Sequence, residues 1–392
     1  MAVAPADYPA LFRQYAVRSA QVTLDRVRAH EGSFVGAPQE QIFQALDFAM
    51  QLDEAWPWVK DVLLTIAPQM VQAGYQDGWA PYLVRGIELA ETRGDVRTTA
   101  ELQLNLGWLL QMRGDFDGAD VWYAKSLAAF ERFGDDNGAG RALSRQSFVA
   151  CMCNEYERAQ ALAEHALSLF APDDPERAAA LNAVGRVAFY RGEFGDAQRA
   201  FEQALSLREE HGDLDNVARN LRDIGNVFVA LHRFDEAMTN FERARRILQS
   251  ARCSREEAYL LNNMGNVFCE LHRFGDALRC YAEALSMHME WQDELGVAVE
   301  TFNLGYARHM MGDVDLAKPH FIAALRLWRR LGNLYMQAES LRYLGDVYAT
   351  REQSRRARAA YCHAHILLRT LEPTSAVEEL RKVLTGSLAG LT

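Results

Sequence analysis

The sequence has few residues of the kinds that interrupt helices or cross-link chains. Its 392 residues include ten prolines and six cysteines, and no run of β-branched residues has the alternation of a strand. The cysteines lack the spacing of a disulfide framework, which favours reduced thiols and a cytoplasmic protein. No apolar run is long enough to span a bilayer. The first twenty residues have no unbroken apolar core, so we expect neither a secretory signal nor an anchor there.

Motifs for catalysis and metal binding are also missing. The chain has no phosphate-binding loop of the form G-x-x-x-x-G-K-[ST], no G-x-S-x-G, no H-E-x-x-H and no kinase motifs. Cys151-x-Cys153 and His363-x-His365 are spaced by two on predicted helices, which points the members of each pair apart. A net charge of -11 argues against a surface for nucleic acid. We therefore expect a protein that is not an enzyme and has no cofactor, no metal and no nucleic-acid partner.

What the chain does contain is a repeat of about forty residues. Residues 220–237 and 261–277 have closely similar sequences. Each copy includes the run Gly-Asn-Val-Phe and, two residues later, the run Leu-His-Arg-Phe. The register extends in both directions from these two copies. It places anchor glycines at Gly107, Gly185, Gly225, Gly265, Gly305 and Gly345, with Ser147 where a seventh would fall.

Two further columns support this register. Alanine stands twelve residues after each anchor, and an aromatic ring stands sixteen after it, with Ala163 as the exception. Paired helices approach closely only where small residues face each other, so we expect the rings to fill the gaps that glycine and alanine leave. The unit with Ser147 and Ala163 lacks both the anchor glycine and the ring. We expect residues 141–166 to be the weakest part of the array.

This column pattern on a helix-turn-helix resembles the tetratricopeptide repeat over roughly residues 100–370. The longer unit is similar to those of kinesin light chains, Partner-of-Inscuteable scaffolds, Rap-type regulators and the sensor arrays of STAND-class ATPases. The resemblance implies an all-α protein, an α-solenoid of helix hairpins with capping helices at both ends.

The pattern also suggests how the chain is divided. Residues 1–57 are predicted to be a helical N-terminal cap, and residues 58–370 the array, with a degenerate first unit at 58–97. Residues 9–95 are similar to the segment that joins the ATPase module to the repeats in STAND-class regulators. Residues 371–392 are predicted to hold a closing helix, where Ser375 and Glu378 have the spacing of a capping box.

The face of each first helix that does not pack is polar and includes rings. In tetratricopeptide folds this face lines the concave groove. Asparagine is a poor helix former, so its concentration on one face favours a function, although tolerated surface substitution would also explain it. Carboxamides can bind the backbone of an extended peptide. The predicted partner-binding residues are Arg145, Asn182, Arg186, Tyr190, Arg219, Arg222, Asn226, Asn262, Asn263, Asn266, Asn303 and Tyr306.

Arg222, Asn226 and Asn263 also resemble part of the carboxylate clamp of chaperone-binding tetratricopeptide domains, although Val299 and Asn303 replace its other basic pair. The resemblance implies a scaffold for signalling or complex assembly. It would hold an extended protein or peptide segment in its concave groove, and acidic groups or a free C-terminus are candidate features of that segment. The alternative is a ligand-sensing regulator that acts on a separately encoded ATPase, protease or transcription factor. We expect no membrane partner.

Overall fold

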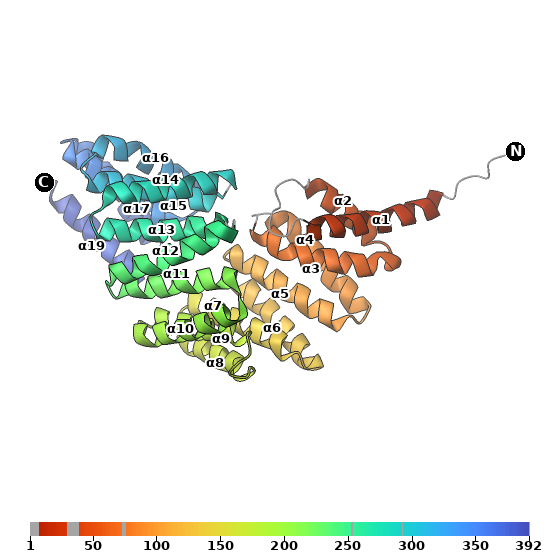
Figure 1. Ribbon diagram of the computed structural model, residues 1–392. Helices are drawn as coiled ribbons and strands as arrows, with labels where there is room; N and C mark the ends of the chain where they lie inside the picture. Colours follow the sequence, from red (N-terminus) through yellow and green to blue (C-terminus); the bar gives the residue numbers. More distant parts are fainter. Residues whose placement is uncertain (1–7, 30–38, 73–75, 252–253, 292, 392) are drawn as a thin grey trace. The chain divides into compact units, whose positions relative to one another are not determined.

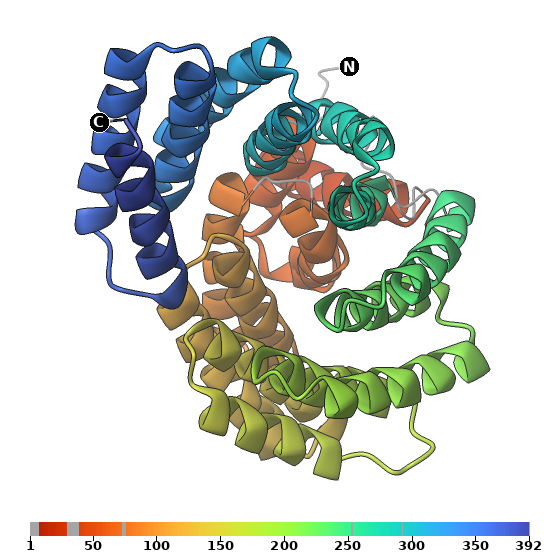
Figure 2. The same ribbon diagram turned by 90° about the vertical axis from the view of Figure 1, so that its left-hand side faces the viewer.

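The structure is a computed structural model that describes residues 8–29, 39–72, 76–251, 254–291 and 293–391. All regular secondary structure in these residues is helical, as the repeat pattern predicts, and consecutive helices lie side by side (Figures 1 and 2). The chain forms two compact units, Met1–Asn220 and Leu221–Thr392. The boundary falls within one helix, α11 (Leu214–Ala230).

The N-terminal unit contains the predicted cap and the first helix pairs. The helices before α11 are α1 (Tyr8–Ala29), α2 (Gln39–Ala49), the short 3-10 helix η1 (Asp53–Ala55), α3 (Trp56–Gln72), α4 (Gln76–Thr92), α5 (Val96–Met112), α6 (Phe116–Phe133), α7 (Asp136–Met152), α8 (Tyr156–Ser168), α9 (Arg177–Tyr190) and α10 (Phe194–His211).

The C-terminal unit continues the alternation of first and second helices. After α11 come α12 (Phe234–Ala251), α13 (Ser254–Glu270), α14 (Phe274–Glu290), α15 (Glu294–Met310), α16 (Val314–Arg330), α17 (Leu334–Thr350), α18 (Ser354–Arg369) and α19 (Ser375–Ala389). The closing helix lies where the sequence predicts it. Its cap is Thr374, whose hydroxyl accepts from the amide of Val377 at 3.3 Å, and not Ser375. The division at residues 57, 97 and 370 stays a prediction.

Each anchor glycine lies against the ring sixteen residues further on. A Cβ added to Gly185 would lie 2.7 Å from the ring of Phe201, and one added to Gly107 would lie 2.7 Å from that of Tyr123. The alanine column is fully buried in every repeat. The sequence therefore predicted both the register and its packing reason correctly.

The exceptional repeat solves the same packing problem in another way. Because Ala163 has no ring, there is room for a side chain at the anchor, and Ser147 is buried there. Its hydroxyl donates to the carbonyl of Ala159 at 2.8 Å. The loss of glycine and the loss of the ring are therefore one coupled change.

The turns between the helices of a pair need left-handed backbone. Gly114, Gly192 and Gly312 supply it in three repeats, with φ between 77° and 84°. His232 and His272 take this position in the two nearly identical repeats, with φ of 57° and 56°. These duplicated histidines are therefore turn residues.

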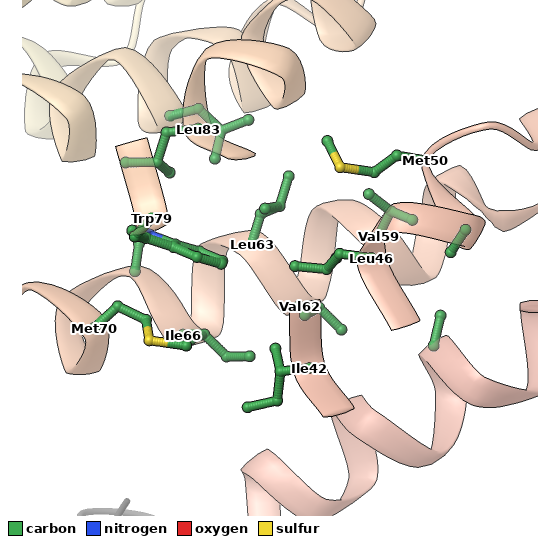
Figure 3. Packing of buried hydrophobic residues seen from close by; sticks show 14 of the residues in the cluster. Ile42, Leu46, Met50, Val59, Val62, Leu63, Ile66, Met70, Trp79 and Leu83 are labelled. Carbon is green, nitrogen blue, oxygen red and sulfur yellow. The ribbon is translucent and has the colours of Figure 1, made fainter. Parts of the chain in front are cut away.

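The N-terminal helices share one core with the first helix pairs. Leu24 of α1 and Leu46 of α2 are buried together with Leu63 of α3 and Trp79 and Leu83 of α4. Figure 3 shows the labelled side chains of α2, α3 and α4 pointing toward one another. Residues of the predicted cap and of the predicted first unit thus bury their apolar side chains in one cluster.

Candidate functional site

The predicted partner-binding residues lie on the first helices, which are the odd-numbered helices from α7 to α15. We divide these residues by compact unit and name the two sets the unit-1 stripe and the unit-2 stripe. The unit-1 stripe consists of Arg145 on α7, Asn182, Arg186 and Tyr190 on α9, and Arg219 on α11. The unit-2 stripe consists of Arg222 and Asn226 on α11, Asn262, Asn263 and Asn266 on α13, and Asn303 and Tyr306 on α15.

Several asparagines of these stripes bind each other across neighbouring repeats. Asn182 is buried and pairs with Asn220, the two amides exchanging hydrogen bonds of 2.8 and 3.1 Å. Asn220 also accepts from the guanidinium of Arg208 and donates to the carbonyl of Phe201 at 3.0 Å. The amide of Asn182 is thus engaged in the packing of α9 against α11. This differs from the expectation that the whole stripe is turned outward.

A half-buried pair repeats the arrangement in the C-terminal unit. The amide of Asn263 donates to Oδ1 of Asn226 at 3.0 Å and so joins α13 to α11. Part of the asparagine signal in the sequence therefore has a structural cause, because each pair satisfies two polar groups between helices.

A directed chain of hydrogen bonds runs from α14 to α15. The hydroxyl of Tyr281 donates to Oδ1 of Asn266 at 2.8 Å, Nδ2 of Asn266 donates to Oδ1 of Asn262 at 3.2 Å, and Nδ2 of Asn262 donates to Oε1 of Glu300 at 2.8 Å. Asn266 is exposed, whereas Tyr281 and Glu300 are 1% exposed. In this arrangement the oxygen of Asn266 accepts from Tyr281, and one of its two N–H groups donates to Asn262. The second N–H therefore remains for an acceptor in solvent.

Glu300 is the functional candidate that the sequence reasoning missed. Burial raises the pKa of its carboxyl to about 8, against the amides of Asn262 and Asn303, which favour the ionised form. Its Oε2 accepts no hydrogen bond from any residue that the structure describes. A signal was present, because Glu300 stands five residues before its anchor in a column that is buried in every repeat: Leu102, Ala142, Ala180, Asn220, Leu260, Glu300 and Ser340.

The positive charge of Arg222 is balanced by acidic side chains of the protein itself. Its guanidinium donates to Glu256 at 2.7 Å and to Asp223 at 3.3 Å. Arg342, on α17, is held in the same way by Glu339 at 3.0 Å and Asp346 at 3.2 Å. A ligand carboxylate would have to compete with these acids, so Arg222 does not fit the role of a clamp residue.

Arg145 in the N-terminal unit has a different environment. It is half-buried, with its guanidinium carbon 4.9 Å from the ring centre of Trp108, and it forms no hydrogen bond or ion pair with any described residue. Burial lowers the pKa of its side chain, and the nearby positive charges of Arg186, Arg219 and Arg141 lower it further. Arg186 lies over the ring of Phe148 at 5.5 Å.

The two aromatic side chains of the stripes, Tyr190 and Tyr306, differ in exposure and in their ring contacts. Tyr190 is 43% exposed and meets Phe189 edge to face at 5.8 Å. Tyr306 is half-buried and meets Tyr343 edge to face at 5.7 Å, and Tyr343 in turn stacks on Phe321 at 5.1 Å. Tyr190 is therefore partly exposed, whereas Tyr306 belongs to a packed aromatic cluster.

Among the residues described, no group of three His, Cys, Asp or Glu side chains is arranged to hold a metal ion. None of the helices within the described ranges is both long enough and apolar enough to cross a membrane. Cys253 lies outside the described residues.

Comparison with protein families identifies the repeats. The MalT-like tetratricopeptide region matches residues 140–302, and two further tetratricopeptide-repeat models match residues 296–369 and 99–132. The chain is a tetratricopeptide-repeat protein. The matched residues include every anchor position predicted from the columns. No curated protein matches the chain.

Solved structures show the same fold at low identity. A STAND protein with a tetratricopeptide repeat sensor from Pyrococcus horikoshii is similar at 12% identity and a TM-score of 0.62, over 94% of this chain and 55% of that one. This tetratricopeptide chain thus corresponds to about half of the STAND protein. A Rap protein complexed with competence and sporulation factor is similar at 12% identity and a TM-score of 0.59, over 96% and 99% of the two chains. Aspartyl phosphate phosphatase F from Bacillus subtilis is similar at 10% identity and a TM-score of 0.53, over 95% and 96%.

Proposed function

We propose that the protein is an interaction scaffold whose unit-2 stripe binds an extended polypeptide segment through the segment's main-chain carbonyls. The repeat family supports the role of scaffold. The observation that carries the finer proposal is the orientation of Asn266, whose exposed amide presents N–H because Tyr281 occupies its oxygen. An oriented donor on an exposed helix face suits an acceptor, and an extended polypeptide carries one at every residue.

The structure also explains why such a donor would be selective. An unconstrained asparagine can rotate its amide to suit either a donor or an acceptor. The chain from Tyr281 through Asn266 and Asn262 to Glu300 removes that freedom. A pre-oriented donor loses less conformational entropy on binding, so it contributes more to affinity.

Two of the similar structures bear on the choice between a scaffold and a sensor. The Rap structure contains competence and sporulation factor, and the Pyrococcus protein uses its repeats as a sensor. The three proteins share a fold, and what each of them binds does not follow from that fold.

The test replaces the oriented donor by an acceptor of the same shape. Asn266→Asp is compared with the wild-type protein and with Asn240→Asp, a half-buried position on the second helix α12. Peptides are first selected on the wild-type protein from a random display library, and their affinities are measured by fluorescence anisotropy. We expect Asn266→Asp to weaken binding at least tenfold, because a carboxylate repels a peptide carbonyl. We expect Asn240→Asp to bind like the wild type.

Equal affinities of the two variants would contradict the proposal. Native mass spectrometry of the purified protein examines the rival function, a sensor of small molecules. A stoichiometric metabolite retained by the wild type and lost in Asn266→Asp would favour the sensor over the scaffold.

A further inference from the structure

The hydrogen-bond chain below Asn266 ends in a thiol on one side and in a carboxyl group on the other. Sγ of Cys269 lies 3.5 Å from the hydroxyl oxygen of Tyr281, and either atom can be the donor of this pair. The chain then passes through Asn266 and Asn262 to Glu300. A thiol, a hydroxyl and an amide each donate and accept. The direction of the chain is therefore set by the one group that can lose its donor, Glu300.

Ionised Glu300 sets the direction that the structure shows. A carboxylate accepts hydrogen bonds and cannot donate them, so Asn262 turns its Nδ2 toward Oε1 of Glu300, at 2.8 Å. The oxygen of Asn262 then takes a donor from Asn266, at 3.2 Å, and the oxygen of Asn266 takes one from Tyr281, at 2.8 Å. In this direction the remaining N–H of Asn266 is left for an acceptor in solvent.

Protonated Glu300 favours the opposite direction. A proton on Oε2 would be buried without an acceptor among the described residues, and buried donors without a partner are rarer than buried oxygens without one. A proton on Oε1 would meet the N–H of Asn262, unless that amide turns by half a rotation. After such a turn Glu300 donates to Asn262, Asn262 to Asn266, Asn266 to Tyr281, and Tyr281 to Cys269. Every link of the chain is then satisfied again.

The reversal changes what Asn266 offers to a ligand. Its nitrogen and oxygen exchange places, so a lone pair stands where the available N–H stood. Asn266 is exposed, whereas Tyr281 and Glu300 are 1% exposed, so the change at the buried end is read out at the surface. A main-chain carbonyl that met a donor now meets another acceptor.

We propose that Glu300 controls ligand binding at Asn266 by a proton-dependent reversal of this chain, so that the ionised carboxyl permits capture of a main-chain carbonyl and the protonated carboxyl prevents it. The proposal rests on the proposed function, because the ligand is taken to be a polypeptide held at Asn266. Glu300 acts here as a positioning residue, since it touches no ligand.

Other titratable side chains lie on the helices around the chain. They are Cys269 and Glu270 on α13, Tyr281 on α14, Tyr306 on α15, His320 on α16 and Arg342 on α17. Burial raises the pKa of Cys269, Tyr281 and Tyr306 and lowers that of His320, so these groups are neutral between pH 7 and 9. Arg342 stays a cation, and Glu270 is exposed. Of this set and Glu300, it is Glu300 whose charge changes in that range.

The binding test compares pH 7 with pH 9. Burial raises the pKa of Glu300 to about 8, so the ionised fraction rises about tenfold between these two values, and the apparent affinity should rise by about the same factor. The probe is a fluorescein-labelled peptide selected on the wild-type protein at pH 9 from a random library, with blocked ends and no residue that titrates in this range. An equal affinity of the wild type at both pH values would overturn the proposal.

Three variants separate the chain from other effects of pH. Glu300→Gln has no carboxyl to titrate, so its affinity should change less than about twofold between pH 7 and 9. The matched control Glu290→Gln removes an exposed carboxylate at the end of α14 and should keep the tenfold change. Asn262→Ala interrupts the chain and should also abolish the pH dependence. A tenfold change that persists in Asn262→Ala would mean that Glu300 acts through space, and would overturn the reversal.

A measurement without ligand keeps this inference apart from the proposed function. The side-chain carbonyl carbon of Asn266 is followed by NMR in protein with 13C-labelled asparagine, and its signal is identified by its loss in Asn266→Asp. We expect its chemical shift to titrate between pH 7 and 9 in the wild type and to stay constant in Glu300→Gln. A constant shift in the wild type would overturn the reversal even if peptides bind. A titrating shift in a protein that captures no peptide at pH 9 would support the reversal and contradict the proposed function.

Discussion

The ring of Phe201 covers the backbone of Gly185 so closely that a Cβ on the glycine would lie 2.7 Å from the ring. The same relationship holds between each anchor glycine and its ring. It makes the glycine a packing residue, since its backbone is ordinary helix and needs no left-handed φ.

Gly185→Ala should therefore destabilise the protein by about 1–3 kcal/mol, the usual range for an overpacked site. Gly195, in the first turn of the paired helix α10, has nothing within 4 Å of its virtual Cβ. Gly195→Ala should be neutral or stabilising by up to about 1 kcal/mol, because alanine is the better helix former. Thermal denaturation of the two variants measures the difference, and equal melting temperatures would contradict the packing role.

Ser147 and Ala163 should behave as one unit. Ala163→Phe alone should destabilise the protein, because the new ring meets the side chain of Ser147. Ser147→Gly alone should cost about 1 kcal/mol through the lost hydrogen bond to Ala159. The double variant restores the pattern of the other repeats, so it should be less destabilised than the sum of the two changes by about 1 kcal/mol or more. A strictly additive cycle, measured by urea denaturation, would show that the two positions are independent.

Glu300 should make stability depend on pH. Burial raises the pKa of its carboxyl in the folded state to about 8, from the 4.5 of a solvated glutamate, so between these values the folded state binds a proton that the unfolded state has released. The contribution of Glu300 is complete below about pH 4.5 and is lost as pH rises through 8. The free energy of unfolding falls by at most about 1.4 kcal/mol per pH unit in this range. Glu300→Gln should flatten the curve of melting temperature against pH between 5 and 8, and an unchanged curve would place the carboxyl in a wetter environment than the structure shows.

Arg222 should matter for stability. A quarter of its side chain is exposed, and it compensates both Asp223 and Glu256. Arg222→Met leaves two half-buried carboxylates together, so we expect a loss of about 1–2 kcal/mol after allowing for screening by solvent. Arg145→Met, the same substitution at an uncompensated position, should show no loss. Chemical denaturation of the pair tests whether the two arginines differ as the structure indicates.

The sequence by itself determined the helical class, the forty-residue register and the packing columns. A glycine opposite a ring leaves a periodic trace, because every repeat meets the same steric limit where its two helices touch. The exception at Ser147 and Ala163 was visible as well, although not its compensation by a hydroxyl, since that bond depends on where the carbonyl of Ala159 lies in space.

Only the tertiary structure decided which polar residues of the stripes are engaged by other side chains of the protein. Side chains about forty residues apart meet across neighbouring helices, so Asn182 is taken up by Asn220 and Arg222 by Glu256, whereas Asn266 keeps an exposed amide and Arg145 finds no acid among the described residues. The sequence shows only that a residue can form a hydrogen bond or an ion pair. Whether the protein itself already satisfies that capacity depends on contacts between repeats, and these form only when the helices pack.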